Sequence, residues 1–164
     1  MITLIVAKDQ DGLIGANNRL PWYNKEELNF FRNKTSHEIV VMGRKTWEST
    51  GSRPLPYRHN IILTRDPYLD VGEFREEVTV CSCPEEAIAL YEHDGIRNLY
   101  VIGGKEAFEA FKPYYTHAVV STVYGTFTGD TYIDMKSLIG NARSYHTFHG
   151  DGYRVDYYEV NRHD

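Results

Sequence analysis

An acidic residue near the start of a predicted helix is the first candidate for chemistry. Glu27 follows Pro21-Trp22 and lies beside Leu28 and Phe31 on the apolar side of that helix. Burying a carboxylate is unfavourable unless it binds a polar group, and a carboxyl that holds a polar heterocycle can assist proton transfer. A structural interpretation competes, because Asn24-x-x-Glu27 has the spacing of a capping box. On local sequence alone the cap is favoured, since first helical turns are rich in Glu.

A basic segment is the second candidate. Residues 44–65 carry five basic side chains and one acidic one, although the whole chain has a net charge of −5. Helices predicted to begin at Arg44 and at Lys105 would add backbone N–H donors and positive dipole ends, which suit phosphate. The segment therefore predicts a site for a phosphorylated ligand. The alternative is a solvated basic patch that makes no specific contact.

A pair of glycines is the third candidate. Gly103-Gly104 lies between an apolar run and a predicted helix. Two glycines let a backbone approach a pyrophosphate closely, but an isolated pair is more often a simple turn. The pattern is neither G-x-G-x-x-G nor a P-loop, so it does not identify a nucleotide site by itself.

Histidine and cysteine offer little chemistry in this chain. His146 and His149 fall in a predicted strand at a spacing that does not suit a helical metal pair, so we interpret them as structural. Cys81 and Cys83 have no neighbouring His, which argues against a zinc site and against a thiol nucleophile. We therefore expect two reduced, half-buried cysteines and no bound metal.

The elements that must position these groups alternate along the chain. Apolar runs predict strands, helical patterns predict helices between them, and this alternation is typical of a parallel sheet. The predicted strands are 2–7, 39–42, 60–63, 78–81, 99–102 and 118–123, and the predicted helices are 25–34, 44–49, one beginning near Pro84 and one after Gly104. Runs at 145–148 and 153–160 flank Gly150-Asp151-Gly152, which indicates a β-hairpin.

The fold class that follows is α/β. We expect a mostly parallel twisted sheet with flanking helices and an antiparallel C-terminal edge strand. Ligands of such sheets bind beyond the carboxyl ends of the strands, where Gly43-Arg44-Lys45-Thr46, Thr64-Arg65 and Gly103-Gly104 follow predicted strands. The stretch from Asp9 to Tyr23 reads as a long connection without regular structure, and such connections are usually lids or binding loops.

Composition sets further bounds. A chain of 164 residues, 41% hydrophobic and 25% charged, predicts one globular domain over 1–164. Its longest apolar runs are four residues, far short of a membrane span, and it enters a strand at once, so we expect no signal peptide and a cytoplasmic protein. A net charge of −5 is unsuited to binding nucleic-acid phosphates.

Together these pieces resemble dihydrofolate reductase. The matching stretches, in the family's order and over nearly the whole chain, are Ile14-Gly15, Leu20-Pro21-Trp22, Glu27-Leu28-x-x-Phe31, Val41-Met42-Gly43-Arg44-Lys45-Thr46-Trp47-Glu48-Ser49, Arg53-Pro54-Leu55-Pro56-x-Arg58-x-Asn60, Val101-Ile102-Gly103-Gly104 and Gly129-Asp130-Thr131. The resemblance implies NADPH-dependent reduction of 7,8-dihydrofolate to tetrahydrofolate, with hydride transfer to C6 and protonation of N5.

The resemblance also implies roles for residues on the substrate side. Glu27 resembles the carboxyl that holds the pterin, with Trp22 and Ser121 completing the catalytic group. Arg58 resembles the arginine that pairs with the α-carboxylate of the glutamate tail, a task that suits a bidentate guanidinium. The residues that resemble the apolar walls of the substrate site are Ile5, Ala7, Leu28, Phe31, Leu55 and Ile102.

On the cofactor side the resemblance implies three groups. Arg44, Thr64 and Arg65 resemble the set around the 2′-phosphate, and Thr46 with Gly103 to Ala107 resembles the pyrophosphate cradle, with a cis Gly103–Gly104 bond. Ile14, Gly15 and Leu20 resemble the mobile loop over the nicotinamide. The full set expected to contact cofactor is Ala7, Ile14, Gly15, Leu20, Gly43, Arg44, Lys45, Thr46, Leu63, Thr64, Arg65, Gly103, Gly104, Lys105, Glu106, Ala107 and Thr131.

The resemblance sets the remaining expectations. Residues of about 38–96 would form an adenosine-binding subdomain, and the remainder a loop and substrate subdomain. We expect a monomer that binds dihydrofolate and antifolate-type small molecules. Two alternatives stay open: a riboflavin-pathway pyrimidine reductase of the same fold, and a nucleotide-binding module without turnover.

Overall fold

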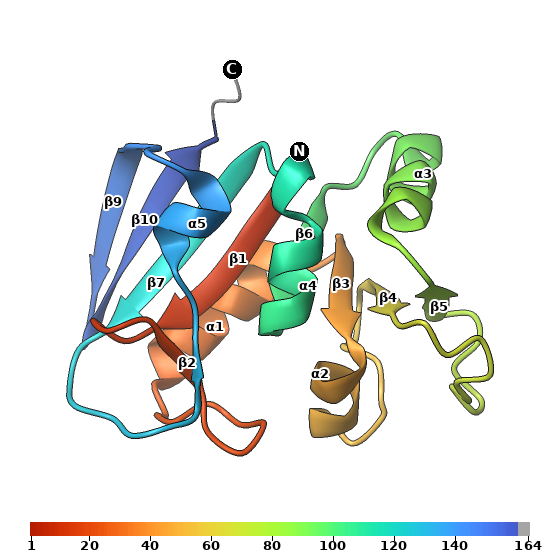
Figure 1. Ribbon diagram of the computed structural model, residues 1–164, viewed down its shortest axis with the longest axis horizontal. Helices are drawn as coiled ribbons and strands as arrows, with labels where there is room; N and C mark the ends of the chain where they lie inside the picture. Colours follow the sequence, from red (N-terminus) through yellow and green to blue (C-terminus); the bar gives the residue numbers. More distant parts are fainter. Residues whose placement is uncertain (161–164) are drawn as a thin grey trace.

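The computed structural model describes residues 1–160, so the last four residues of the expected domain 1–164 lie outside the described part. One large sheet has the strand order β5-β4-β3-β6-β1-β7-β10-β9 (Figure 1). The strands are β1 (Ile2–Lys8), β2 (Leu13–Gly15), β3 (Ile39–Gly43), β4 (His59–Leu63), β5 (Val78–Cys81), β6 (Leu99–Gly103), β7 (His117–Val123), β8 (Thr131–Tyr132), β9 (Ser144–Gly150) and β10 (Tyr153–Glu159). The helices are α1 (Lys25–Thr35), α2 (Arg44–Ser49), α3 (Pro84–Asp94), α4 (Lys105–Ala110) and α5 (Met135–Ile139), with a short 3₁₀ turn η1 (Lys112–Tyr114).

The central strands are apolar because both faces of the sheet are covered. In β3, Ile39 and Val41 pack on one face while Val40 and Met42 pack on the other, and all four are buried. Side chains alternate along a strand, so a continuous apolar run supplies two cores at once. The α/β class expected from the sequence is therefore confirmed.

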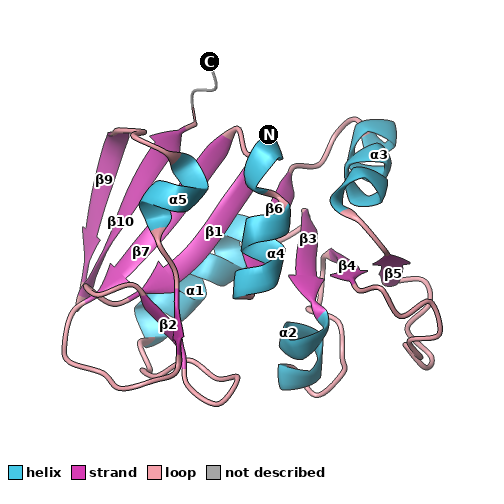
Figure 2. Cartoon of the chain, in the orientation of Figure 1, coloured by secondary structure: helices cyan, strands magenta, loops and turns pink. Residues whose placement is uncertain are grey.

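Different helices cover the two faces (Figure 2). The first core contains residues of α3, α4 and α5, with Phe108 and Phe111 among its largest side chains. The second contains Trp47 of α2 and packs against Phe30 and Phe31 of α1. Helix α1 therefore lies on the opposite face of the sheet from α4.

The helix ends follow local sequence rules. Asn24 precedes α1, and its side chain accepts a hydrogen bond from the Glu27 N–H at 3.0 Å. Pro84 opens α3, where its missing N–H has no cost, and Gly95 ends that helix in the left-handed region with a φ of 71°. These boundaries agree with the predicted ones to within one or two residues.

The C-terminal hairpin is also confirmed. Strand β10 pairs antiparallel with β7 and with β9, so the hairpin closes one edge of an otherwise parallel sheet. Strands β1, β3, β4, β5, β6 and β7 run parallel to their neighbours in the rest of the sheet. Their carboxyl ends consequently meet at one edge.

The stretch from Asp9 to Tyr23 differs from the prediction. It is not without regular structure, because β2 pairs with β8 and Ala16 pairs with Arg19 across a tight turn. Asn17 and Asn18 at that turn have φ of 50° and 63°. Asn tolerates this region, and an Asn pair is a turn signal that could have revealed the ribbon from the sequence. Helix α5 and strand β8 were also not predicted.

Cys81 ends β5 opposite Leu63 of β4 and so lies at the same sheet edge, whereas His146 lies in the edge strand β9. Cys81 and Cys83 are both free thiols, and burial raises the pKa of Cys81 to about 11. Cys81 is more buried than expected because it ends β5 under α3. The His146 ring packs on Tyr157 at 5.5 Å. Within residues 1–160, no helix is both long and apolar enough to cross a membrane.

Candidate active site

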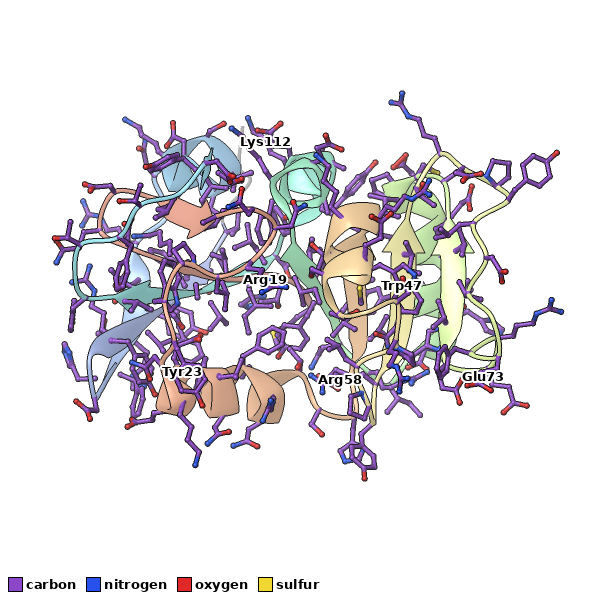
Figure 3. The ribbon with its side chains drawn as sticks, turned by 90° about the horizontal axis from the view of Figure 1, so that it is seen from below. Arg19, Tyr23, Trp47, Arg58, Glu73 and Lys112 are labelled. Carbon is purple, nitrogen blue, oxygen red and sulfur yellow. The ribbon has the colours of Figure 1, made fainter. Side chains whose placement is uncertain are left out.

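Many of the predicted site residues follow the carboxyl ends of the parallel strands, whereas Arg58 comes just before β4 begins. Ala7 of β1 is opposite Ser121 of β7, and Gly43 of β3 is close to Gly103 of β6. Figure 3 views the molecule from this side, with Arg19 between the N-terminal loop segment and α2, and Arg58 beside the end of α1. Strand ends from distant parts of the sequence therefore supply one surface.

Glu27 is a buried carboxyl at this edge. Its exposed fraction is 6%, and burial raises its pKa while a hydrogen bond from the Ser121 side chain works in the opposite direction. Desolvation disfavours the charged form of a carboxyl, whereas a donated hydrogen bond favours it. Ser121 itself is buried in β7. The arrangement therefore holds a carboxyl whose pKa is above that of an exposed Glu.

The two interpretations of Glu27 are separated by its own atoms. Its backbone N–H donates to the Asn24 side chain, which is one half of a capping box. Its carboxyl instead has Ser121 as hydrogen-bond partner. Asn24 is thus the cap, and the carboxyl of Glu27 is directed toward the sheet.

Trp22 presents an unpartnered donor in the same region. Its side chain is 9% exposed, and its buried Nε1 has no hydrogen-bond partner within residues 1–160. The ring packs against Phe127 with centroids 5.3 Å apart. A buried N–H that lacks an acceptor is costly, so such an atom indicates a place for a polar group.

The predicted apolar walls share one cluster. Ile5 and Trp22 are buried in the second core, and four half-buried side chains pack against that core: Ala7, Phe31, Leu55 and Ile102. Leu28, also half-buried, follows Glu27 directly on α1. Partly exposed apolar side chains beside a buried carboxyl suit a flat ligand with one polar edge.

Arg58 is held in place before any ligand binds. Its Nη1 donates to Thr35 Oγ1 at 2.9 Å, and its Nε donates to the Pro56 carbonyl at 2.9 Å. Burial lowers the pKa of Arg58, and nearby Arg32 lowers it further. Thr35 was not singled out in the sequence. Its position eight residues after Glu27, on the same helix, is the signal that could have found it.

The glycine positions meet beside Thr46. A Cβ at Gly104 would lie 3.8 Å from Thr46 Oγ1, and one at Gly103 would lie 3.4 Å from the Phe108 ring. The Gly103–Gly104 peptide bond is cis, as expected. Helix α2 begins directly after Gly43, and α4 begins directly after Gly104. Bare backbone and two helix starts therefore share one corner of the edge.

The basic residues surround that corner at its outer side. Arg44 pairs with Glu48 at 2.9 Å and with Asp66 at 3.2 Å. The side chains of Lys45 and Arg65 are exposed, whereas Leu63 and Thr64 at the end of β4 are half-buried. Among the predicted pyrophosphate residues, Lys105 and Glu106 are exposed and Ala107 is buried.

Residues 13–19, which contain β2 and the turn between Ala16 and Arg19, contact the segment 129–131. Asp130 accepts from the Asn17 N–H at 3.0 Å, and its own N–H donates to the Gly15 carbonyl at 3.0 Å. Thr131 pairs with Gly15 in the small β2–β8 sheet. Ile14 is half-buried, and Leu20 is 49% exposed. The predicted loop residues are therefore anchored to the 129–131 segment.

Other hollows of the surface contain none of the predicted site residues. One of about 570 Å³ is lined by Asn24, Lys25, Glu26, Asn29, Asp151 and Gly152, and another of about 360 Å³ lies beside α5. No group of three or more His, Cys, Asp or Glu in the described chain could hold a metal ion.

Comparison with known proteins decides the family. A family model described as dihydrofolate reductase matches residues 1–160. This chain belongs to the dihydrofolate reductase family. The family resemblance expected from the sequence is confirmed, and with it the expectation of an oxidoreductase.

Individual members of the family give the degree of similarity. The dihydrofolate reductase of Bacillus subtilis (strain 168) is 35% identical over 136 residues, covering 79% of this chain and 73% of that protein. The dihydrofolate reductase of Enterococcus faecium is 39% identical over 127 residues, covering 77% and 74%. A solved dihydrofolate reductase from Enterococcus faecalis, complexed with NADP(H) and RAB-propyl, superposes with a TM-score of 0.85 at 30% identity, covering 98% of this chain and 96% of that one.

We expect the buried Glu27 carboxyl to lower the stability of the folded protein at neutral pH. The pKa of Glu27 is higher in the folded protein than its ordinary value of 4.5. Between the two pKa values the folded protein binds more protons than the unfolded chain, so stability falls as pH rises through that window. We expect Glu27→Gln to raise Tm at pH 7 by about 2–4 °C, which corresponds to roughly 1 kcal/mol in a domain of this size. The gain should vanish well below pH 4.5.

Thermal unfolding monitored by circular dichroism across pH measures this effect. Glu26→Gln is the matched control, because it makes the same change at the exposed neighbouring position and should show no comparable gain at pH 7. A lower Tm for Glu27→Gln at every pH would instead show that the carboxyl stabilises the helix start.

Proposed function

We propose that this protein reduces 7,8-dihydrofolate to tetrahydrofolate with NADPH. The observation that carries the proposal is the buried Glu27 carboxyl with its raised pKa, hydrogen-bonded by Ser121 at the edge where the strands end. The family assignment supports this reaction and does not favour the pyrimidine reductase or the module without turnover.

Glu27 is the group that would recognise the pterin. A carboxylate can accept two parallel hydrogen bonds from an amidine-like edge, and the half-buried side chains of Phe31 and Leu55 would pack against the ring. NADPH, when bound, supplies a hydride for C6 of the substrate. Glu27 would orient the ring, raise the basicity of N5 and order a water that delivers the proton. The unpartnered Nε1 of Trp22 is a donor suited to such a water.

The nucleotide would lie along the corner formed by the glycines and the basic residues. The bare backbone at Gly103 and Gly104 leaves the space beside Thr46 that a pyrophosphate needs, since a Cβ there would contact the threonine or Phe108. Arg44 and Arg65 have the charge that a 2′-phosphate requires, and Thr64 stands directly before Arg65 after the end of β4. These residues therefore fit NADPH.

The remaining expectations belong to the same proposal. Residues of about 38–96 would act as the adenosine-binding subdomain, since they contain α2, β4, β5 and α3 beside the basic corner. The protein would act as a monomer in the cytoplasm, with folates and antifolates as its small-molecule partners. Its net charge of −5 supports small-molecule rather than nucleic-acid ligands.

The reaction itself is tested by following NADPH absorbance with purified protein. We expect oxidation that depends on dihydrofolate, that an antifolate blocks and that NADH supports much more slowly. Because the two substrates must lie together, neither should be consumed alone. Tight NADPH binding without dihydrofolate-dependent oxidation would contradict the proposal and favour one of the two alternatives.

The role of Glu27 makes a kinetic prediction. Glu27→Gln should lower kcat/KM at neutral pH by about 10²–10⁴-fold, the usual range for lost acid–base assistance. The defect should shrink at low pH, where the substrate is already protonated in solution. Steady-state kinetics between acid and neutral pH measure this, with Glu26→Gln as the matched control. Normal turnover in Glu27→Gln would reduce the carboxyl to a structural role.

The role of Arg58 is tested by changing the substrate. Arg58→Ala should weaken dihydrofolate binding by roughly 1.5–3 kcal/mol, the range for a hydrogen bond to a charged group. A dihydropterin without the glutamate tail should bind both proteins alike. Arg53→Ala, an exposed arginine of the same connection, is the control and should leave binding unchanged. Equal losses for both substrates would contradict a contact with the glutamate tail.

A further inference from the structure

The guanidinium of Arg44 is shared between two carboxylates. Its Nε donates to Glu48 Oε1 at 2.9 Å, and its Nη1 donates to Asp66 Oδ2 at 3.2 Å. The Arg44 side chain is 49% exposed and that of Asp66 is 38% exposed, so the pair faces solvent. The residue with the charge for a 2′-phosphate therefore already has anionic partners.

Asp66 is fixed in this position by its own surroundings. Its backbone N–H donates to Thr64 Oγ1 at 3.2 Å, and its Oδ1 accepts from the Tyr68 N–H at 2.9 Å. One carboxylate oxygen thus forms the turn after β4, which leaves the other oxygen directed at Arg44. The carboxylate is built into the turn and is not a side chain that swings away easily.

Asp66 differs from Glu48 in where it comes from. Glu48 lies one turn after Arg44 on the same helix, an ordinary exposed i,i+4 pair of small energy. Asp66 comes from the end of β4, directly after Thr64 and Arg65, which are the other two residues assigned to the phosphate. Asp66 consequently places a negative charge among Arg44, Thr64 and Arg65, the residues assigned to the 2′-phosphate.

We propose that Asp66 is a specificity-determining residue that competes with the cofactor's 2′-phosphate for Arg44 and so narrows the preference for NADPH over NADH. The inference rests on the proposed function, because it needs an adenosine 2′-position beside Arg44. A phosphate bound there is repelled by the Asp66 carboxylate, whereas the 2′-hydroxyl of NADH can donate a hydrogen bond to it. Acidic residues favour a ribose hydroxyl and arginines favour a 2′-phosphate for this reason.

The test is the substitution Asp66→Asn with binding of NADPH and NADH measured by titration calorimetry. Asn keeps the Oδ1 acceptor for the Tyr68 N–H, removes the charge, and replaces the Oδ2 that accepts from Arg44 by an amide NH₂ that cannot accept. The matched control is Glu73→Gln, which removes one negative charge from the exposed part of the same β4–β5 connection (Figure 3). Thermal unfolding establishes that both variants are folded.

We expect Asp66→Asn to lower the Kd for NADPH by about 3- to 10-fold at low ionic strength, with the Kd for NADH changing by less than about 2-fold or rising. The gain should shrink as salt is added, because exposed charges are screened. Glu73→Gln should change neither value comparably. In an Arg44→Ala background, Asp66→Asn should improve NADPH binding much less, since only the direct repulsion between the Asp66 carboxylate and the phosphate remains.

Three results would overturn the inference in different ways. If wild-type protein prefers NADPH but Asp66→Asn changes both cofactors equally, or no more than Glu73→Gln, Asp66 does not compete for Arg44 and the proposed function stands. If wild-type protein shows no preference for NADPH and Asp66→Asn creates none, the assignment of the 2′-phosphate site fails together with the inference. A gain of the same size in the Arg44→Ala background would refute competition at that guanidinium.

Discussion

A parallel sheet buried on both faces is the constraint from which the rest of the structure follows. Its strands must be apolar along their length, so polar chemistry is excluded from the sheet's interior and collects where the strands end. Because the strands run in one direction, Gly43, Leu63, Gly103 and Ser121 reach the same edge from distant parts of the chain. Helices α1 and α2 both pack against the second core, whereas α4 packs on the opposite face of the sheet.

The buried carboxyl is the main exception to this separation. Glu27 enters from α1 at 6% exposure, where burial raises its pKa and the hydrogen bond from Ser121 opposes the shift. Such a group is held by the packing around it at the expense of local stability, a pattern typical of functional sites. The Nε1 of the neighbouring Trp22 is also a buried polar atom that costs local stability, because it has no hydrogen-bond partner in the described chain.

The two halves of the proposed site are prepared differently. Arg58 is oriented by Thr35 and the Pro56 carbonyl, neutral acceptors that leave its charge available to a carboxylate ligand. Arg44 is instead oriented by Glu48 and Asp66, which partly neutralise it. Neutral partners leave the charge of an arginine available to an anionic ligand. Anionic partners must instead be displaced by such a ligand. In the proposed site, Arg58 would therefore contribute to affinity for the substrate, and Arg44 to selectivity for the cofactor.

The sequence by itself determined the strand and helix pattern, the C-terminal hairpin, the cap at Asn24 and the family, because these depend on local periodicity, on turn residues and on motifs such as Met42-Gly43-Arg44-Lys45-Thr46. It did not reveal the β2–β8 pairing, which joins segments more than a hundred residues apart. The resemblance already grouped Ser121 with Glu27, but tertiary structure alone decided that Thr35 holds Arg58 and that Asp66 reaches Arg44. Each is a side-chain contact between separate elements, and burial, pKa and charge pairing depend on such contacts and not on neighbours in the chain.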